Sequence, residues 1–263
     1  MHEPQKIIIH TQEDFEGMRR AGRLAAATLD MITQHIKPGI TTDALNTLCH
    51  DFTLDHGGQP APLNYHGYPK SICTSVNHVA CHGIPGEKTL HDGDILNIDV
   101  TTILDGWHGD TSRMFIVGEA SVKAKRLIDV TFEAMWDGIR AVKPGATVGD
   151  IGHAMQTHAE RHRCTVVEEF CGHGIGRVFQ TVPTIMNYGT PGTGPVLAEG
   201  MFFTVEPMLN LGKPGVKILG DGWTAVTKDR SLSAQFEHSI AVTADGFEVF
   251  TLSPEGLDKP PYS

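Results

Sequence analysis

Apolar residues recur at helical spacing in the first sixty residues of the chain. A predicted helix runs from Thr11 to about His35, and Lys37-Pro38-Gly39 ends it. Thr42 is predicted to cap a second helix, which extends to about His56. The apolar face of the first helix consists of Met18, Ala21, Ala25, Leu29 and Ile32.

The second half of the chain repeats this pattern. Two further helices are predicted at Val122–Val142 and Val148–Arg163, with Lys143-Pro144-Gly145 between them. The string IKPGITTDAL in the first half matches VKPGATVGDI in the second. Matching strings in matching positions indicate a duplicated structural unit.

Strand-like segments follow the helices in each half. Because two helices precede several strands, the pattern favours an α+β fold with a mixed, largely antiparallel sheet flanked by helices, over strict βαβ alternation. No low-complexity linker divides the chain. We therefore expect one domain over 1–263, with pseudo-symmetric halves at about 12–119 and 120–252 and a peripheral tail at 253–263. The predicted strands are Ser71–Val76, Ile95–Leu104, Ser112–Val117, Thr165–Glu168, Met201–Met208, Thr224–Thr227, Ser233–Val242 and Glu248–Leu252.

Composition narrows the class of protein. A hydrophobic content of 40% and a charged content of 20% are typical of a globular protein, and the net charge of −10 disfavours binding to nucleic acid. The five cysteines form no C-x-x-C pair, which indicates free thiols in a reducing compartment. The N-terminal segment resembles neither a signal peptide nor an anchor. These features predict a cytoplasmic protein without a membrane span.

Candidate chemistry is also duplicated, because each half contains a histidine followed by two acids. CHGIP in the first half matches GHGIG in the second, and DGDILNID matches EGMFFTVE. Two such units facing each other would bring four carboxylates and two imidazoles to one cleft. That donor set suits two divalent metal ions. The six residues are His82, Asp99, Asp110, His173, Glu206 and Glu237.

The local pattern predicts how two of these acids meet. Asp105-Gly106 is a strong turn signal, so the strand that contains Asp99 should form a hairpin with the strand that contains Asp110. The two carboxylates would then project from one face, opposite or diagonal to each other. Repulsion between buried carboxylates would raise the pKa of one of them, and metal ions would remove that conflict. Any one of these acids alone would more often be a cap or an ion-pair partner, so the inference depends on the whole set.

Longer motifs resemble a known family. The strings CHGIPG, NIDVT, GDTSRMF, CGHGIGR, FTVEPM and KDRSLSAQFEHSI are similar to those of type I methionine aminopeptidases of the compact bacterial form. The resemblance runs from about Glu13 to Phe250. It implies the pseudo-symmetric pita-bread fold and a dinuclear metalloaminopeptidase that removes the initiator methionine, preferably before a small second residue.

The resemblance also implies roles for the six residues. Asp110 and Glu237 would bridge two divalent ions (cobalt, manganese, iron or zinc), Asp99 would complete one site, and His173 with Glu206 the other. A bridging water or hydroxide would attack the peptide bond, and Glu206 would act as general base. His82 would lie outside the metal shell and donate a hydrogen bond to the scissile amide.

One position departs from the family pattern. Gln180 stands where the family usually has a second catalytic histidine. A glutamine amide can donate a hydrogen bond to the substrate carbonyl, but it cannot shuttle a proton. We therefore expect reduced turnover, unless the change is neutral. The methionine pocket is expected at Tyr65, Tyr68, Cys73, Phe179 and Trp223, with Pro62 where a cysteine is common.

Three alternatives remain at this point. The chain could be a proline-directed aminopeptidase of the same fold, a low-activity paralogue, or a non-catalytic, ribosome-associated binding module. All five metal ligands are present, which disfavours the last of these. The expected partners are N-terminal methionine peptides and nascent chains, with transient ribosome contact, no DNA, no membrane and a monomeric state.

Overall fold

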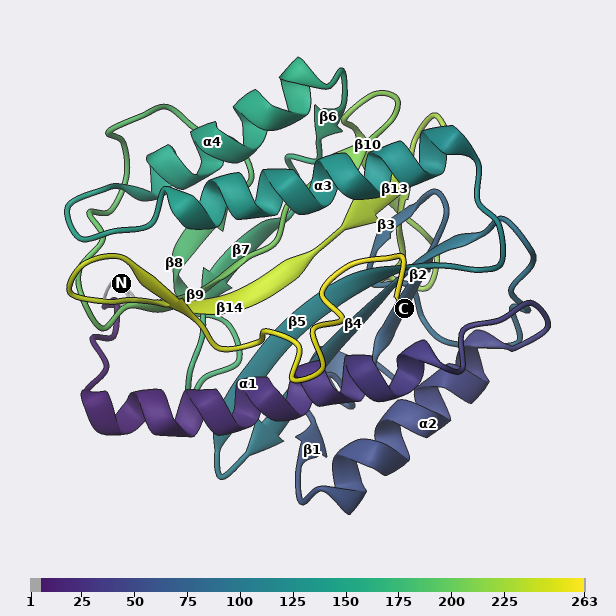
Figure 1. Ribbon diagram of the computed structural model, residues 1–263, viewed down its shortest axis with the longest axis horizontal. Coiled ribbons are helices and arrows are strands. Elements are labelled where there is room, and N and C mark those ends of the chain that lie inside the picture. The colour runs from purple at the N-terminus through teal and green to yellow at the C-terminus, as the bar shows by residue number, and fades with distance from the viewer. Residues whose placement is uncertain (1–5, 263) are drawn as a thin grey trace.

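The computed structural model describes residues 6–262, and it contains four α-helices that lie in two pairs (Figure 1). Residues 1–5 and Ser263 lie outside the described part, so the expectation about the N-terminal segment is addressed only from Lys6 onward. No helix within residues 6–262 has the length and apolar character needed to cross a membrane. The helices are α1 (Gln12–Thr33), α2 (Thr42–Asp55), α3 (Val122–Arg140) and α4 (Val148–Arg161), with one short 3₁₀ turn at Tyr65–Gly67.

Fifteen strands form three sheets, and every pair of named strands is antiparallel. The large sheet has the order β1-β4-β5-β14-β9-β7-β8, with β2 on β4 and β15 on β14. The small sheets are β13-β10-β6 and β11-β12-β3. The strands are β1 (Gln59–Pro60), β2 (Cys73–Val76), β3 (Val79–Cys81), β4 (Ile95–Leu104), β5 (Trp107–Ile116), β6 (Thr165–Val166), β7 (Cys171–Gly174), β8 (Thr181–Met186), β9 (Phe202–Val205), β10 (Met208–Asn210), β11 (Val216–Ile218), β12 (Ala225–Thr227), β13 (Ser233–Gln235), β14 (Glu237–Val242) and β15 (Phe247–Val249).

The centre of the large sheet joins the two halves of the chain. Strands β5 and β14 pair with each other, β4 flanks the first and β9 flanks the second. Helices α1 and α2 lie along one side of this arrangement and α3 and α4 along the other (Figure 1). The predicted α+β class, antiparallel sheet and pseudo-two-fold arrangement are therefore confirmed, whereas the boundaries of the two halves within one domain stay a prediction.

One face of the β4–β5 hairpin packs closely against α1. The hydroxyl of Thr102 donates to the carbonyl of Ala21, and a Cβ on Gly109 would lie 2.3 Å from that same carbonyl oxygen. Only glycine allows this approach of strand and helix. Because side chains alternate along a strand, the neighbours Thr101 and Asp110 face the opposite side, away from α1.

The residues that cap α2 and α4 occupy matching positions in the two repeats. The N-cap of α2 is Thr41, not Thr42, and its hydroxyl accepts a hydrogen bond from the amide of Ala44. Thr147, at the matching position of the second repeat, caps α4 in a capping box with Asp150. The first of two adjacent threonines has the extended backbone that an N-cap requires, while the second is already helical.

Two of the predicted strands are each divided into two shorter ones. The segment Met201–Met208 divides into β9 and β10, and Ser233–Val242 divides into β13 and β14, so each continues in a different sheet. Pro207 lacks an amide hydrogen and stands at the first division. Glu206 and Glu237 lie at these divisions, where the backbone leaves one sheet for another.

The C-terminal tail, which was expected to be peripheral, makes specific contacts with α1 and β5. The hydroxyl of Ser253 bonds the carboxylate of Asp30, which is also paired with the fully buried Arg113. Near the end of the tail, Tyr262 donates a hydrogen bond to the carbonyl of Met114 and packs on the ring of Phe115. The tail thus ties β5 to α1 from outside.

Candidate metal centre and active-site cavity

The first two acids of the centre lie on adjacent strands. Asp99 on β4 pairs across the hairpin with Ser112, and Asp110 on β5 pairs with Thr101. The two carboxylates are therefore diagonal neighbours on the face turned away from α1, as the hairpin prediction required. Asp110 is 4% exposed, and its Oδ1 accepts a hydrogen bond from the Thr101 hydroxyl at 2.7 Å.

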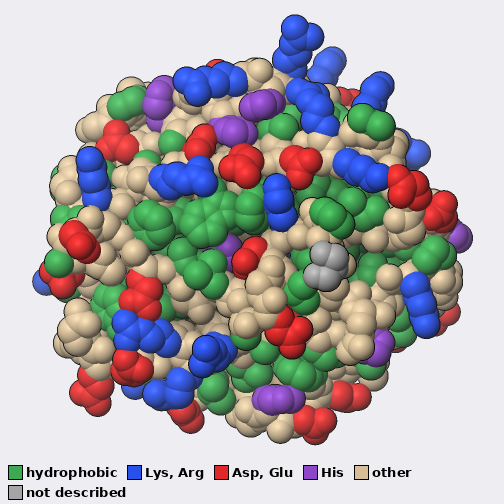
Figure 2. All heavy atoms as spheres, viewed as in Figure 1, with side chains coloured by type: hydrophobic (Ala, Val, Ile, Leu, Met, Phe, Trp, Pro, Cys, Tyr) green, Lys and Arg blue, Asp and Glu red, His purple; other side chains and the backbone are tan. Residues whose placement is uncertain are grey.

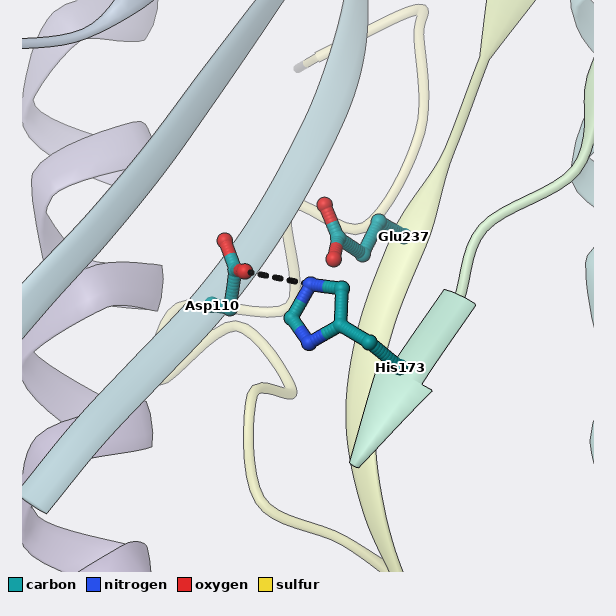
Figure 3. A group of neighbouring side chains, drawn as sticks. All are labelled: Asp110, His173 and Glu237. Atoms are coloured by element: carbon teal, nitrogen blue, oxygen red, sulfur yellow. Dashed lines mark ion pairs between the residues drawn. The ribbon is translucent and has the colours of Figure 1, made fainter. Parts of the chain in front are cut away.

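Three further residues reach the same place from the second half. His173 lies on β7, Glu206 directly after β9, and Glu237 at the start of β14. Figure 3 shows the imidazole of His173 between the carboxylates of Asp110 and Glu237. One potential ligand atom each from Asp110, His173 and Glu237 lies within 4.8 Å of the other two.

Glu206 completes the group on the side of His173. The Nε2 atom of His173 lies 3.6 Å from Asp110 Oδ2 and 3.8 Å from Glu206 Oε1. The Nδ1 atom of His173 is 3.2 Å from the carbonyl oxygen of Gly174. A proton on Nδ1 that is donated to this carbonyl leaves the Nε2 lone pair free to coordinate a metal ion.

The glycines on both sides of His173 serve close packing between strands. A Cβ on Gly172 would lie 2.4 Å from the carbonyl oxygen of Thr204, and one on Gly174 would lie 2.2 Å from that of Val182. Neither glycine has a positive φ angle. The GHG motif therefore allows β7 to approach its neighbours, and it lies in a strand that is not among those predicted from the sequence.

Burial makes the ionised acids costly in the protein without metal. It raises the pKa of Glu206 to about 8 and that of Asp99 to about 7. The pKa values of Asp110 and Glu237 lie well above their usual range because of burial and neighbouring carboxylates. Burial lowers the pKa of His173 to about 4, so this imidazole is neutral at pH 7.

This donor set fits divalent metal ions. Four carboxylates and a neutral imidazole provide oxygen and nitrogen ligands, and the positive charge of the ions would offset the repulsion that raises the carboxyl pKa values. The structure brings Asp110, His173 and Glu237 into one compact group, with Glu206 beside His173. Asp99 stands diagonal to Asp110, outside that compact group.

A cavity of about 180 Å³ opens above these acids. All residues expected to bind metal or substrate line it, including both histidines and Gln180. Its apolar walls are aromatic: the ring centroids of Tyr65 and Phe179 are 4.7 Å apart, and those of Tyr68 and Trp223 are 5.1 Å apart. A concave space with apolar walls and a few convergent polar groups is typical of a site that binds a small ligand or substrate group.

His82 has a strained backbone at the wall of this cavity. Its φ angle is +55°, in the left-handed region, and burial lowers the pKa of its imidazole. The ring lies edge-on to Phe170, with centroids 5.2 Å apart. Strain in a non-glycine residue is often concentrated at functional sites, where the surrounding structure holds it.

The sequence reasoning missed several lining residues. Thr101 and Gln235 supply hydrogen bonds to Asp110 and Glu206, and His66 lies at the exposed rim. Thr101 lies two positions after the predicted ligand Asp99, and Gln235 lies two positions before the predicted ligand Glu237. That spacing is the signal that could have identified them.

Similarity to known proteins agrees with this site. The profile of metallopeptidase family M24 matches residues 16–244, so the chain belongs to this family and is a metal-dependent hydrolase. Within it, the chain belongs to the methionine aminopeptidases. It is 63% identical over 257 residues to the methionine aminopeptidase of Rickettsia prowazekii, covering 97% of this chain and 99% of that protein. It is 52% identical over 248 residues to that of Escherichia coli K12, covering 94% of each.

Solved structures show the same relationship. The Rickettsia prowazekii methionine aminopeptidase superimposes with a TM-score of 0.93 at 62% identity, covering 94% of this chain and all of that one. The Thermotoga maritima methionine aminopeptidase gives a TM-score of 0.92 at 40% identity, covering 94% of this chain and 99% of that one. A prolidase from Pyrococcus furiosus gives a TM-score of 0.74 at 20% identity, covering 93% of this chain and 65% of that one. This likeness shows a shared fold alone. These comparisons do not favour the proline-directed or non-catalytic alternatives.

Proposed function

We propose that this enzyme removes the N-terminal methionine from peptides and nascent proteins, preferring a small second residue. The observation that carries the proposal is the position of the four acids and His173 at the floor of a cavity with aromatic walls. A metal-binding floor beneath a one-residue pocket suits cleavage of a single terminal residue. The similarity to methionine aminopeptidases over nearly the whole chain supports the choice of side chain.

Two divalent ions, of cobalt, manganese, iron or zinc, would be held by the five ligands. In this proposal, Asp110 and Glu237 would help to hold both ions, Asp99 would help to hold one of them, and His173 with Glu206 would help to hold the other. When bound, such ions polarise a carbonyl oxygen and lower the pKa of water toward neutrality. The mixture of carboxylates and one imidazole suits each of these metals.

Three side chains of the cavity are assigned to the reaction itself. Glu206 accepts a proton, because its carboxylate lies at the floor and is oriented by hydrogen bonds to both oxygens. His82 donates a hydrogen bond to the scissile amide. Gln180, which is exposed at the rim, donates one to the substrate carbonyl through its amide.

The methionine side chain would occupy the aromatic part of the cavity. The lining contacts support this assignment, because a flexible thioether packs well against aromatic rings. The assigned pocket residues are Tyr65, Tyr68, Cys73, Phe179 and Trp223.

The cellular setting is also part of the proposal. All five cysteines are free thiols, which supports the reducing cytoplasm as the location. Both acidic and basic side chains are scattered over the face in Figure 2, and the net charge of the chain is −10, which supports the absence of a DNA partner. We further propose that the enzyme acts as a monomer, with no membrane association, and that it contacts ribosomes only transiently to reach nascent chains.

The decisive experiment measures free methionine released from Met-Ala and Met-Pro peptides. The protein is first freed of metal with a chelator, and Co²⁺, Mn²⁺, Fe²⁺ and Zn²⁺ are then added one at a time. We expect release from both peptides with at least one ion and none without metal. An Ala-Pro peptide tests the proline-directed alternative and should not be cleaved.

Two variants separate the role of His82 from a general loss of structure. His82→Ala should lower kcat by about 10²-fold or more, the usual scale for a group that assists proton transfer or hydrogen-bonds the reacting atoms. His78→Ala removes a nearby, half-buried imidazole that does not line the cavity, and it should retain wild-type kcat. Absence of methionine release with every metal would defeat the proposed function.

A further inference from the structure

We propose that Thr204 is a positioning residue, whose single hydroxyl fixes His173 and Glu206 relative to each other and so forms their shared metal site. This inference rests on the metal centre proposed above. Thr204 lies on β9 and is completely buried, so its hydroxyl has no access to solvent. It is not itself placed among the metal ligands.

The hydroxyl of Thr204 makes two hydrogen bonds of opposite sense. It donates to Glu206 Oε1 at 2.7 Å, and it accepts from the backbone amide of His173 at 3.0 Å. A hydroxyl has one proton to give, so the bond to Glu206 uses the donor and the bond to His173 uses a lone pair. One oxygen atom therefore links a side-chain ligand to the strand that carries another ligand.

The geometry around Glu206 makes this link specific. The oxygen that accepts from Thr204 is also the one that lies 3.8 Å from His173 Nε2. The other oxygen is 3.4 Å from the side-chain nitrogen of Gln235, a longer and weaker contact. Thr204 therefore supplies the shorter of the two contacts that set the rotation of this carboxylate.

Gly172 permits the contact on the other side. A Cβ at this position would lie 2.4 Å from the Thr204 carbonyl oxygen and 3.1 Å from its hydroxyl. The absence of that atom lets β7 approach β9 closely enough for the amide of His173 to reach the hydroxyl. The GHG motif and the threonine two positions before Glu206 thus act together, although they are distant in sequence.

Hydrogen bonds behind metal ligands hold them in the orientation that binding requires, and their loss commonly weakens metal binding 10- to 100-fold. Thr204→Val removes the hydroxyl and keeps the branched shape, whereas Thr204→Ser keeps the hydroxyl. We expect Thr204→Val to bind the second Mn²⁺ or Co²⁺ ion about 10- to 100-fold more weakly by titration calorimetry. We expect Thr204→Ser to stay within about 3-fold of wild type. The visible spectrum of the Co²⁺-loaded protein should change in the valine variant and be restored in the serine variant.

Thr102→Val is the matched control, because it removes another completely buried threonine hydroxyl that makes a hydrogen bond on the opposite face of the sheet. It should bind two ions with wild-type affinity. The unfolding midpoint of each metal-free variant measures the purely structural cost. A Thr204→Val protein that is less stable but binds both ions normally would overturn the proposal.

Thr204→Ala, which adds no atoms, replaces the valine variant if that protein does not fold. If neither variant folds, Thr204 is a structural residue and the proposal is wrong. Wild-type protein that binds fewer than two ions would instead defeat the dinuclear centre. Two ions in wild type with unchanged affinity in Thr204→Val would defeat only the role of Thr204.

Discussion

Asp99 and Asp110 are diagonal neighbours across the β4–β5 hairpin, because Asp99 pairs with Ser112 and Asp110 with Thr101. The residue directly opposite Asp110 is therefore a hydroxyl donor and not a second acid. This arrangement brings two carboxylates to one face of the hairpin while each keeps a neutral cross-strand neighbour. Burial raises both carboxyl pKa values, and the neighbouring charge of Asp99 raises that of Asp110 further.

The metal-free protein should lose stability as the pH rises. Its Glu206 has a pKa of about 8 in the folded state against an ordinary value of 4.5, so folding favours the protonated form. That contribution is fully present below about pH 4.5 and is lost as the pH rises through 8. His173, with its pKa lowered to about 4, has the opposite effect, but only below its ordinary value of 6.5. Urea denaturation of chelator-treated protein at pH 6.5 and pH 8 should therefore show a lower free energy of unfolding at pH 8.

Two controls isolate the cause of this pH effect. Glu206→Gln removes one titrating group and should reduce the difference between the two pH values, whereas the exposed Glu199→Gln should leave it unchanged. Saturating Mn²⁺ should restore stability at pH 8, since metal binding favours the ionised acids. A free energy of unfolding that is the same at both pH values would contradict the assignment of buried, repelling carboxyls.

Gln180→His should raise kcat/KM for Met-Ala by about 10-fold or more. An imidazole at this rim position can both donate a hydrogen bond and transfer a proton, whereas the amide can donate a hydrogen bond but cannot transfer a proton. The measurement is steady-state kinetics of methionine release across pH 6 to 9. Gln59→His, which places an imidazole at an exposed position on β1, is the control. No gain in kcat/KM would mean that this position does not limit the rate.

Phe179→Ala should raise KM for methionine peptides more than it lowers kcat. The Phe179 ring lies between Tyr65, 4.7 Å away, and His108, 5.7 Å away and nearly parallel, so its loss removes one wall of the pocket. Loss of this apolar contact weakens binding without removing a reacting group. Val178→Ala shortens a neighbouring side chain that is 49% exposed and does not line the cavity, so its KM should stay at the wild-type value. Equal KM values for the two variants would place the methionine elsewhere.

Asp30→Asn should destabilise the protein by about 3–5 kcal/mol, because it leaves the fully buried Arg113 without its ionic partner. The change also weakens the contacts of Ser253 that hold the C-terminal tail. Glu119→Gln, which breaks the exposed pair with Lys125, should cost no more than about 1 kcal/mol. Urea denaturation measures both values. A normal metal content in Asp30→Asn would confirm that the effect is structural, and a loss below about 1 kcal/mol would contradict it.

Features that depend on neighbouring residues were predictable from the sequence. The four helices follow the 3.6-residue apolar spacing, and the first helix of each half ends shortly before Lys-Pro-Gly, because a helix needs only its own amphipathic face and its caps. The hairpin that joins Asp99 to Asp110 has a local cause as well, since Asp105-Gly106 provides the turn. The internal duplication predicted a two-fold arrangement of helices and sheet without any knowledge of their contacts.

Contacts between distant segments were not predictable in the same way. The predicted strands divide near Glu206 and Glu237 because one part of each segment belongs to the large sheet and the other part to a small sheet. An apolar run in the sequence does not indicate which strands it will pair with. The strand that contains His173 was not predicted, because its glycines serve close packing and have no side chains to show a period.

The sequence by itself determined the family, the fold class and the donor atoms available to the site, because residue types, motif strings and local periodicity define these. Only the tertiary structure decided which hydroxyl supports which ligand, how the tail is tied to Asp30 and Arg113, and which aromatic rings enclose the cavity. These are contacts between residues far apart along the chain. They exist only after the two halves have packed together around β5 and β14.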